Sequence, residues 1–174
     1  MVTHAIIKYQ IDRFWDDEYL HLEYVWEPYK DPELVKRWVE MGYPDEPHQS
    51  GFLCDMRRPQ PSWNHRFIEF YENKGWKNIG TAYYRMDTGT VMPTHQDHYN
   101  KYVQVFNLQG QEHKIRRAIV FMEDWASGHY FEGNGEAYTG WKAGCVAEWP
   151  YDTPHMAANI GPTPRYTLQI TGHL

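Results

Sequence analysis

Cysteine and long apolar runs are both scarce in this chain. The 174 residues include 2 cysteines, Cys54 and Cys145, which form no CxxC pair. A disulfide framework and a thiolate zinc site are therefore disfavoured, and we expect a reducing, cytoplasmic location. No stretch approaches the roughly 18 apolar residues of a membrane-spanning helix, and residues 5–7 are too short for the core of a signal peptide. The sequence predicts neither membrane spanning nor secretion.

Positive charge is also in short supply. Lys and Arg number 17 against 23 Asp and Glu, which gives a formal net charge of −6. The basic residues occur only in short groups, so the chain lacks the basic surface that binds phosphates, and no nucleic-acid partner is expected. Aromatic residues, in contrast, make up 17% of the chain and supply the material of a packed core. A chain of this length is expected to form a single domain over residues 1–174.

Residues 1–77 predict a mixed flank of helices, strands and a loop. Asp31 and Pro32 give the start signal of a helix, an N-cap followed by a proline at the first helical position. The apolar spacing after them predicts an amphipathic helix that ends at Gly42. The other expected elements are β-rich segments at 3–11 and 19–26, a proline-rich loop at 43–61 that is a candidate lid, and a helix from Ser62 to Gly75.

Residues 78–172 have a different character. Short β-rich runs, separated by Gly, Asn and Pro turn signals, recur roughly every ten residues, a pattern typical of an antiparallel sandwich or barrel such as a jelly roll. The predicted strands are 80–86, 90–94, 102–108, 115–122, 130–131, 136–138, 146–149, 156–159 and 166–171. The fold class is therefore predicted to be mainly β, with helices flanking its N-terminal side.

Two of the 10 histidines have spacing that suggests a metal site. His95 and Asp97 share one face of an extended segment, although two exposed polar residues at a strand end would give the same pattern. His155 is the histidine downstream that is followed ten residues later by an arginine, Arg165. A hairpin around residues 159–162 would place that pair on adjacent strands. Two histidines and one carboxylate with open positions form the facial triad of non-haem Fe(II) oxygenases.

These residues make the chain resemble the Fe(II)/2-oxoglutarate-dependent dioxygenases, whose core is a double-stranded β-helix. The resemblance covers residues 78–172 and depends on His95 and Asp97, on His155 after a proline, and on Arg165. Residues 116–125 and 141–144 look most like the prolyl-4-hydroxylase-like branch. The resemblance implies that His95, Asp97 and His155 hold Fe(II), which must also bind O2. It implies further that Arg165 binds the distal carboxylate of 2-oxoglutarate.

The remaining 2-oxoglutarate donors are less well marked. Thr167 shares the strand face of Arg165 and can add a hydroxyl group. Members of the branch often place a tyrosine on the strand that corresponds to residues 115–122, which has none here. Tyr84 is our candidate for that role, and its alternative is an aromatic residue packed inside the barrel. His98 is expected at the surface, and His129 in ordinary packing.

The resemblance implies hydroxylation of a peptidyl or free amino-acid side chain, or of another small molecule, with release of succinate and CO2. An aspartate at the carboxylate position of the triad favours hydroxylation over halogenation. Two alternatives stay open at this point. One is a cupin-like module that binds a metal or ligand without turning over 2-oxoglutarate. The other is a cupin-type metalloenzyme that uses no keto acid and therefore has no need of Arg165.

Overall fold

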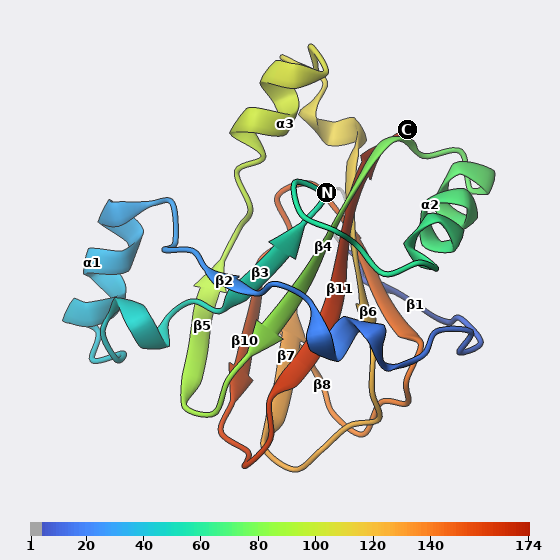
Figure 1. The fold of residues 1–174 in the computed structure, drawn as a ribbon. Coiled ribbons are helices and arrows are strands. Elements are labelled where there is room, and N and C mark those ends of the chain that lie inside the picture. The colour runs from blue at the N-terminus through green and yellow to red at the C-terminus, as the bar shows by residue number, and fades with distance from the viewer. Residues whose placement is uncertain (1–4) are drawn as a thin grey trace.

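Two antiparallel β-sheets face each other in the computed structural model, which describes residues 5–174 (Figure 1). The larger sheet has 7 strands in the order β1-β9-β6-β11-β4-β3-β2, and the smaller has 4 in the order β5-β10-β7-β8. The predicted jelly-roll fold, mainly β, is confirmed. No helix in the described part of the chain is long and apolar enough to cross a membrane.

The elements follow one another without a repeat. The strands are β1 (Ile7–Gln10), β2 (Val25–Trp26), β3 (Phe52–Asp55), β4 (Lys77–Met86), β5 (Thr90–His95), β6 (Ile115–Phe121), β7 (His129–Gly133), β8 (Glu136–Tyr138), β9 (Cys145–Pro150), β10 (His155–Asn159) and β11 (Arg165–His173). The helices are α1 (Pro32–Glu40), α2 (Asn64–Asn73) and α3 (Asn100–Val105), with short 3-10 turns η1 (Asp17–His21), η2 (Glu46–His48) and η3 (Glu112–Lys114).

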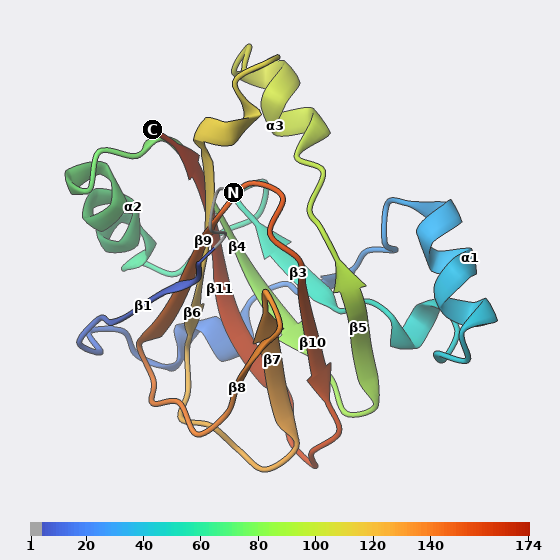
Figure 2. The same cartoon turned by 180° about the vertical axis from the view of Figure 1, so that it is seen from behind.

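The central strands of the larger sheet separate two environments. On β11, Leu168 and Ile170 point into an aromatic-rich core that also contains residues of α2, which packs outside this sheet (Figure 2). Arg165, Thr167 and Gln169 alternate with them and line a cavity on the other face. This is the two-residue period of a strand. One sheet therefore has a structural core on one side and the polar side chains of a candidate site on the other.

The helix predicted to begin after Asp31 is α1. The Asp31 carboxylate accepts a hydrogen bond from the backbone N–H of Leu34 at 3.0 Å, as an N-cap residue does. Gly42 follows the helix with a φ of +93°, in the left-handed region that glycine tolerates. Trp38 is buried, and its ring centroid lies 6.0 Å from that of His95. The helix therefore docks against the end of β5.

The helix predicted from Ser62 to Gly75 is present as α2, but it begins at Asn64 and Ser62 does not cap it. Trp63 occupies the N-cap position, and no side chain caps the helix there. Ser62 instead donates hydrogen bonds from its backbone N–H and its hydroxyl to the carboxylate of Glu18, at 2.8 and 2.6 Å. Ser62 therefore binds a residue distant in sequence, Glu18, instead of capping the helix that follows it.

The strand predicted over 102–108 is wrong, because these residues lie mostly in α3. Tyr102 and Phe106 are one helical turn apart, and their ring centroids are 4.7 Å from each other. Val103 and Leu108 are buried in a small cluster with Ile115. The spacing of these apolar residues fits a helical face, which their aromatic and β-branched composition concealed.

Three predictions in the N-terminal flank are only partly correct. β1 forms within the segment 3–11, of which residues 3 and 4 lie outside the described residues. Of the segment 19–26, the first part belongs to η1 and only β2 is a strand. The predicted loop 43–61 contains η2 and β3, and β3 pairs antiparallel with β4. The prolines of this segment flank β3 without entering it, so the strand can form.

The turn at residues 159–162 is not the predicted hairpin. It carries the chain from β10 in the smaller sheet to β11 in the larger one, and these two strands are not neighbours. β10 pairs instead with β5, and His155 is the register partner of His95. The two triad histidines therefore lie side by side in one sheet, whereas Arg165 comes from the opposite sheet.

Leu168→Ala is expected to lower the free energy of unfolding by about 2 to 5 kcal/mol, because the side chain is fully buried beneath α2. Urea unfolding followed by tryptophan fluorescence measures the change. Val105→Ala, at a position that is 58% exposed on α3, is the control and is expected to cost less than about 1 kcal/mol. Equal losses in the two variants would contradict the division of β11 into a core face and a cavity face.

Candidate metal centre

His95, Asp97 and His155 come together in the cavity. Their ligand atoms all lie within 4.8 Å of one another. The Nε2 atom of His95 is 3.9 Å from Oδ1 of Asp97, and the Nε2 atom of His155 is 3.8 Å from Oδ2. Two neighbouring ligand atoms that are each about 2.1 Å from a metal lie about 3.0 Å apart, so these side chains would close by a short distance to share one ion. The three side chains could therefore hold a divalent metal.

The backbone fixes which nitrogen each imidazole offers. The Nδ1 atom of His95 lies 2.7 Å from the carbonyl oxygen of Pro93, and that of His155 lies 3.0 Å from the carbonyl oxygen of Thr153. A carbonyl only accepts, so Nδ1 carries the proton and Nε2 presents its lone pair to the centre. Burial and repulsion from His155 lower the pKa of His95 to about 4. His95 is thus neutral at pH 7, as a metal ligand must be.

Asp97 is held by two further residues. The Tyr99 hydroxyl donates a hydrogen bond to Oδ2 at 3.1 Å, and the Arg117 Nε atom lies 3.6 Å from the same oxygen. Burial alone would raise the pKa of Asp97, but attraction to Arg117, His155 and His95 outweighs it and lowers the pKa. The backbone of Tyr99 is left-handed, with a φ of +47°, which is unusual for a tyrosine and stores strain beside the site.

Aromatic rings pack against both imidazoles. The ring centroids of Tyr29 and Trp38 lie 5.2 and 6.0 Å from that of His95, both edge to face. Trp149 packs against His155 with a centroid distance of 5.0 Å. These contacts restrict the rotation of the imidazoles, so the ligand atoms are held in place before any metal arrives.

The cavity has a volume of about 630 Å³ and is lined by both sheets. Arg165 lines it, is 4% exposed, and donates from Nη1 to the carbonyl oxygen of Tyr130 at 2.6 Å. Burial lowers the pKa of Arg165 to about 10, so the guanidinium is charged at neutral pH. Its Nε atom and the hydroxyl of Tyr84 are buried without a hydrogen-bond partner among the described residues. Thr167 is the register partner of Tyr84 and lines the same wall.

Buried donors without acceptors are costly, and a charged one is especially so. The Arg165 Nε–H and the Tyr84 hydroxyl are two such donors in one cavity, judged by the residues that the structure describes. A carboxylate offers several acceptor sites and one negative charge, which is the chemistry these donors require. This end of the cavity is therefore suited to an anion.

Gly51 leaves the space that the Tyr84 ring occupies, a role that sequence reasoning missed. A Cβ atom added to Gly51 would lie 2.5 Å from the ring and hydroxyl atoms of Tyr84. The adjacent Ser50 hydroxyl donates to the carbonyl oxygen of Glu27 at 2.6 Å. The segment predicted as a candidate lid thus packs against the cavity wall, and Gly51 is required by close approach rather than by a turn.

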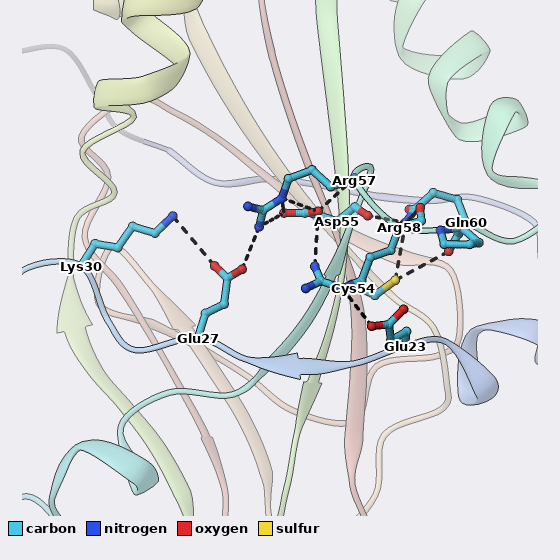
Figure 3. Close-up of polar contacts among 9 residues, drawn as sticks. Glu23, Glu27, Lys30, Cys54, Asp55, Arg57, Arg58 and Gln60 are labelled. Carbon is cyan, nitrogen blue, oxygen red and sulfur yellow. Dashed lines mark hydrogen bonds and ion pairs between the residues drawn. The ribbon is translucent and has the colours of Figure 1, made fainter.

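Ion pairs secure the segment 27–31, which lines the cavity together with residues 97–102. Glu27 accepts a hydrogen bond from Arg57 Nη2 at 2.8 Å, and Arg57 also binds Asp55 at the end of β3 (Figure 3). Lys30 lies at 4.0 Å from the other oxygen of Glu27. These contacts tie the segment that carries Tyr29 to the larger sheet.

Neither His98 nor His129 joins the triad. The side chain of His98 is 59% exposed and lies 3.4 Å from the carboxylate of Asp31, which agrees with its predicted surface location. His129 is buried, and its Nε2 atom lies 3.0 Å from the carbonyl oxygen of Thr163. The sequence analysis missed Arg117, which it grouped with other basic residues. The alternation of β6 is the signal that could have separated it from Arg116.

Comparison with solved structures shows similarity in fold at low sequence identity. A prolyl-4-hydroxylase from Pseudomonas putida superposes with a TM-score of 0.56 and 11% identity, over 90% of this chain and 95% of that one. KdgF from Halomonas sp. gives 0.43 at 13% identity, over 78% and 89% of the two chains. The cupin domain of Schizosaccharomyces pombe Cnp3 gives 0.43 at 10% identity, over 71% and 65%. No protein-family model and no curated protein sequence matches this chain.

Asp97→Ala is expected to weaken Mn(II) binding by more than about a hundredfold, because it removes a charged ligand rather than a group that supports one. Anaerobic isothermal titration calorimetry measures the affinity, with Mn(II) as an oxygen-stable probe. His98→Gln is the matched control, next to Asp97 in sequence but directed at Asp31, and should bind Mn(II) like the wild type. The same affinity in Asp97→Ala and His98→Gln would rule out this triad.

Proposed function

We propose that the protein is an Fe(II)- and 2-oxoglutarate-dependent dioxygenase. It hydroxylates a small molecule or an amino-acid side chain, free or within a peptide, and releases succinate and CO2. The observation that carries the proposal is one cavity lined by a possible His-Asp-His triad and by Arg165 and Tyr84, whose Nε atom and hydroxyl have no hydrogen-bond partner among the described residues. Metal binding alone would not require the buried donors of Arg165 and Tyr84.

The donor set of the triad suits Fe(II). His95 and His155 offer one neutral nitrogen each, and Asp97 offers one carboxylate. Three protein ligands on one side of a six-coordinate ion leave positions for a chelating keto acid and for O2. When bound, the iron and 2-oxoglutarate supply the oxidising chemistry, and the protein supplies ligands, orientation and a dry cavity.

The second carboxylate of 2-oxoglutarate fits the other wall. Arg165 is fixed by its hydrogen bond to the carbonyl oxygen of Tyr130, which orients the guanidinium while its Nε atom stays free. Tyr84 can donate its hydroxyl proton to the same carboxylate, and Thr167 lies beside both. A charge-assisted hydrogen bond from a buried guanidinium is short and strong, so Arg165 is the principal anchor.

Aromatic side chains line another part of the cavity. Phe131 and Trp149 are buried, line the cavity, and stack with a centroid distance of 5.5 Å. Tyr29 covers His95 from the segment 27–31. This segment and residues 97–102 line the remaining part of the cavity, where we expect the substrate to bind.

Arg165→Ala is expected to weaken 2-oxoglutarate binding by about 2 to 4 kcal/mol, because it removes a buried charged partner of the carboxylate. The visible charge-transfer band of the anaerobic Fe(II)–2-oxoglutarate complex reports the affinity. Arg116→Ala is the control, since its side chain donates to backbone carbonyl oxygens instead. Metal-loaded wild type that forms no such band would contradict the proposal and leave a metal-binding module.

Gly51→Ala is expected to weaken 2-oxoglutarate binding on the order of tenfold, since the new methyl group displaces the Tyr84 hydroxyl and costs one hydrogen bond to a charged group. Mn(II) affinity should not change. Gly80→Ala is the control, because a Cβ atom there would meet nothing within 4 Å. Unchanged 2-oxoglutarate affinity in Gly51→Ala would remove Tyr84 from the set of donors.

A further inference from the structure

The cavity contains a second arginine that the proposed reaction does not use. Arg117 lies on β6, lines the cavity, and has a side chain that is 17% exposed. Its Nη1 atom donates to the hydroxyl of Thr171 and its Nη2 atom to the amide oxygen of Gln169, each at 2.6 Å. Both acceptors are neutral and belong to β11. They fix the plane of the guanidinium without neutralising it, and its Nε atom has no hydrogen-bond partner among the described residues.

Asp97 is the acid that faces this guanidinium. Its Oδ2 atom is 3.6 Å from Arg117 Nε, which is an ion pair without a hydrogen bond. In the proposed function Asp97 coordinates the metal, so its negative charge is no longer available to balance Arg117. Of the two acids on the segment 27–31, Glu27 pairs with Arg57, and Asp31 caps α1 by accepting a hydrogen bond from the backbone N–H of Leu34.

The net charge of the centre with metal and 2-oxoglutarate bound is positive. A divalent metal, Arg165 and Arg117 contribute four positive charges, whereas Asp97 and 2-oxoglutarate contribute three negative ones. The loaded centre therefore keeps one positive charge in a largely buried cavity, where an unpaired ion is costly. A ligand with one negative charge beside Arg117 would balance it.

We propose that Arg117 forms a second carboxylate site beside the metal centre, separate from Arg165; this proposal rests on the proposed function. The carboxylate comes from the primary substrate or from the keto-acid end of 2-oxoglutarate. Arg117 is the register partner of Thr171, six residues along β11 from Arg165, or about 20 Å at 3.3 Å per residue, so it does not share the carboxylate that Arg165 binds. The charge of the loaded centre favours the primary substrate, because both carboxylates of 2-oxoglutarate are already counted in it.

The substrate class narrows accordingly. A planar guanidinium held by two neutral acceptors is suited to a carboxylate, which would contact the part of the Arg117 side chain that lines the cavity. Free amino acids, other small carboxylic acids and acidic or C-terminal peptide residues carry that group. A neutral internal peptide segment does not, and it would leave the charge of Arg117 unbalanced.

The test follows the Nε–H signal of Arg117 by NMR in the 15N-labelled full chain. Zn(II) serves as a diamagnetic metal and acetate as the probe, with and without 2-oxoglutarate. Arg117→Lys, which lacks this signal, gives the assignment. We expect acetate to shift the Arg117 signal of the wild type saturably. In Arg117→Gln, where other signals of the cavity report binding, the apparent affinity for acetate should fall on the order of tenfold. Arg116→Gln, the neighbour on β6, should leave the response unchanged.

Two further arms identify the source of the carboxylate. If acetate still shifts the signal when 2-oxoglutarate is bound, and Arg117→Gln keeps the wild-type affinity for 2-oxoglutarate, the site serves the primary substrate. If 2-oxoglutarate itself shifts the signal and blocks acetate, the site serves the keto acid. A signal that neither acetate nor 2-oxoglutarate moves in the Zn(II)-loaded protein overturns the proposal and leaves Arg117 as a support for Asp97.

A metal-free variant separates this proposal from the proposed function. Asp97→Asn keeps the shape of the side chain and removes its charge, so Arg117 loses its ion-pair partner without any metal. Acetate should then shift the Arg117 signal in that variant. This response, together with a wild type that binds no 2-oxoglutarate, would end the dioxygenase proposal while keeping the carboxylate site.

Discussion

Burying a guanidinium in a protein requires an acceptor, and the arrangement of this cavity follows from that constraint. Arg165 is 4% exposed, remains charged at neutral pH and leaves its Nε atom without a partner among the described residues. The hydroxyl of Tyr84 shares this condition. A fold retains such a pair at a cost in stability when a ligand completes it. The possible metal triad lines the same cavity, so one ligand could be held there at both ends.

The side chains that would hold such a ligand come from both sheets of the jelly roll. The smaller sheet supplies His95 and His155 from adjacent strands in register, whereas the larger supplies Arg165 and Arg117 from β11 and β6. The separation of the two sheets is set by packed aromatic residues rather than by the polar residues of the site, because Phe131 and Trp149 stack between the sheets. The cavity therefore exists before any ligand binds, and its polar groups are already oriented.

Much of this was predictable from the sequence, and the failures have physical causes. The strands from β4 onward, apart from the segment that became α3, follow from two-residue alternation and turn residues, and α1 follows from Asp31 and Gly42. His95 and Asp97 could be named because His-x-Asp spacing is local, and His155 because Arg165 follows it ten residues later. The pairing of His155 with His95 could not, since strand order depends on which sheet each strand joins after residues 159–162. Gly51 and Arg117 were missed because their roles depend on a single contact across the fold, with Tyr84 and Asp97.

We propose that a single ligand is held at one end by the metal triad and at the other by Arg165 and Tyr84. Calorimetric titration of 2-oxoglutarate under anaerobic conditions, into protein with and without Mn(II), tests it most directly. Two-ended binding predicts that 2-oxoglutarate binds the Mn(II)-loaded protein far more tightly than the metal-free protein, and that Arg165→Ala removes most of the affinity in the loaded state. Equal affinity with and without the metal would contradict the claim.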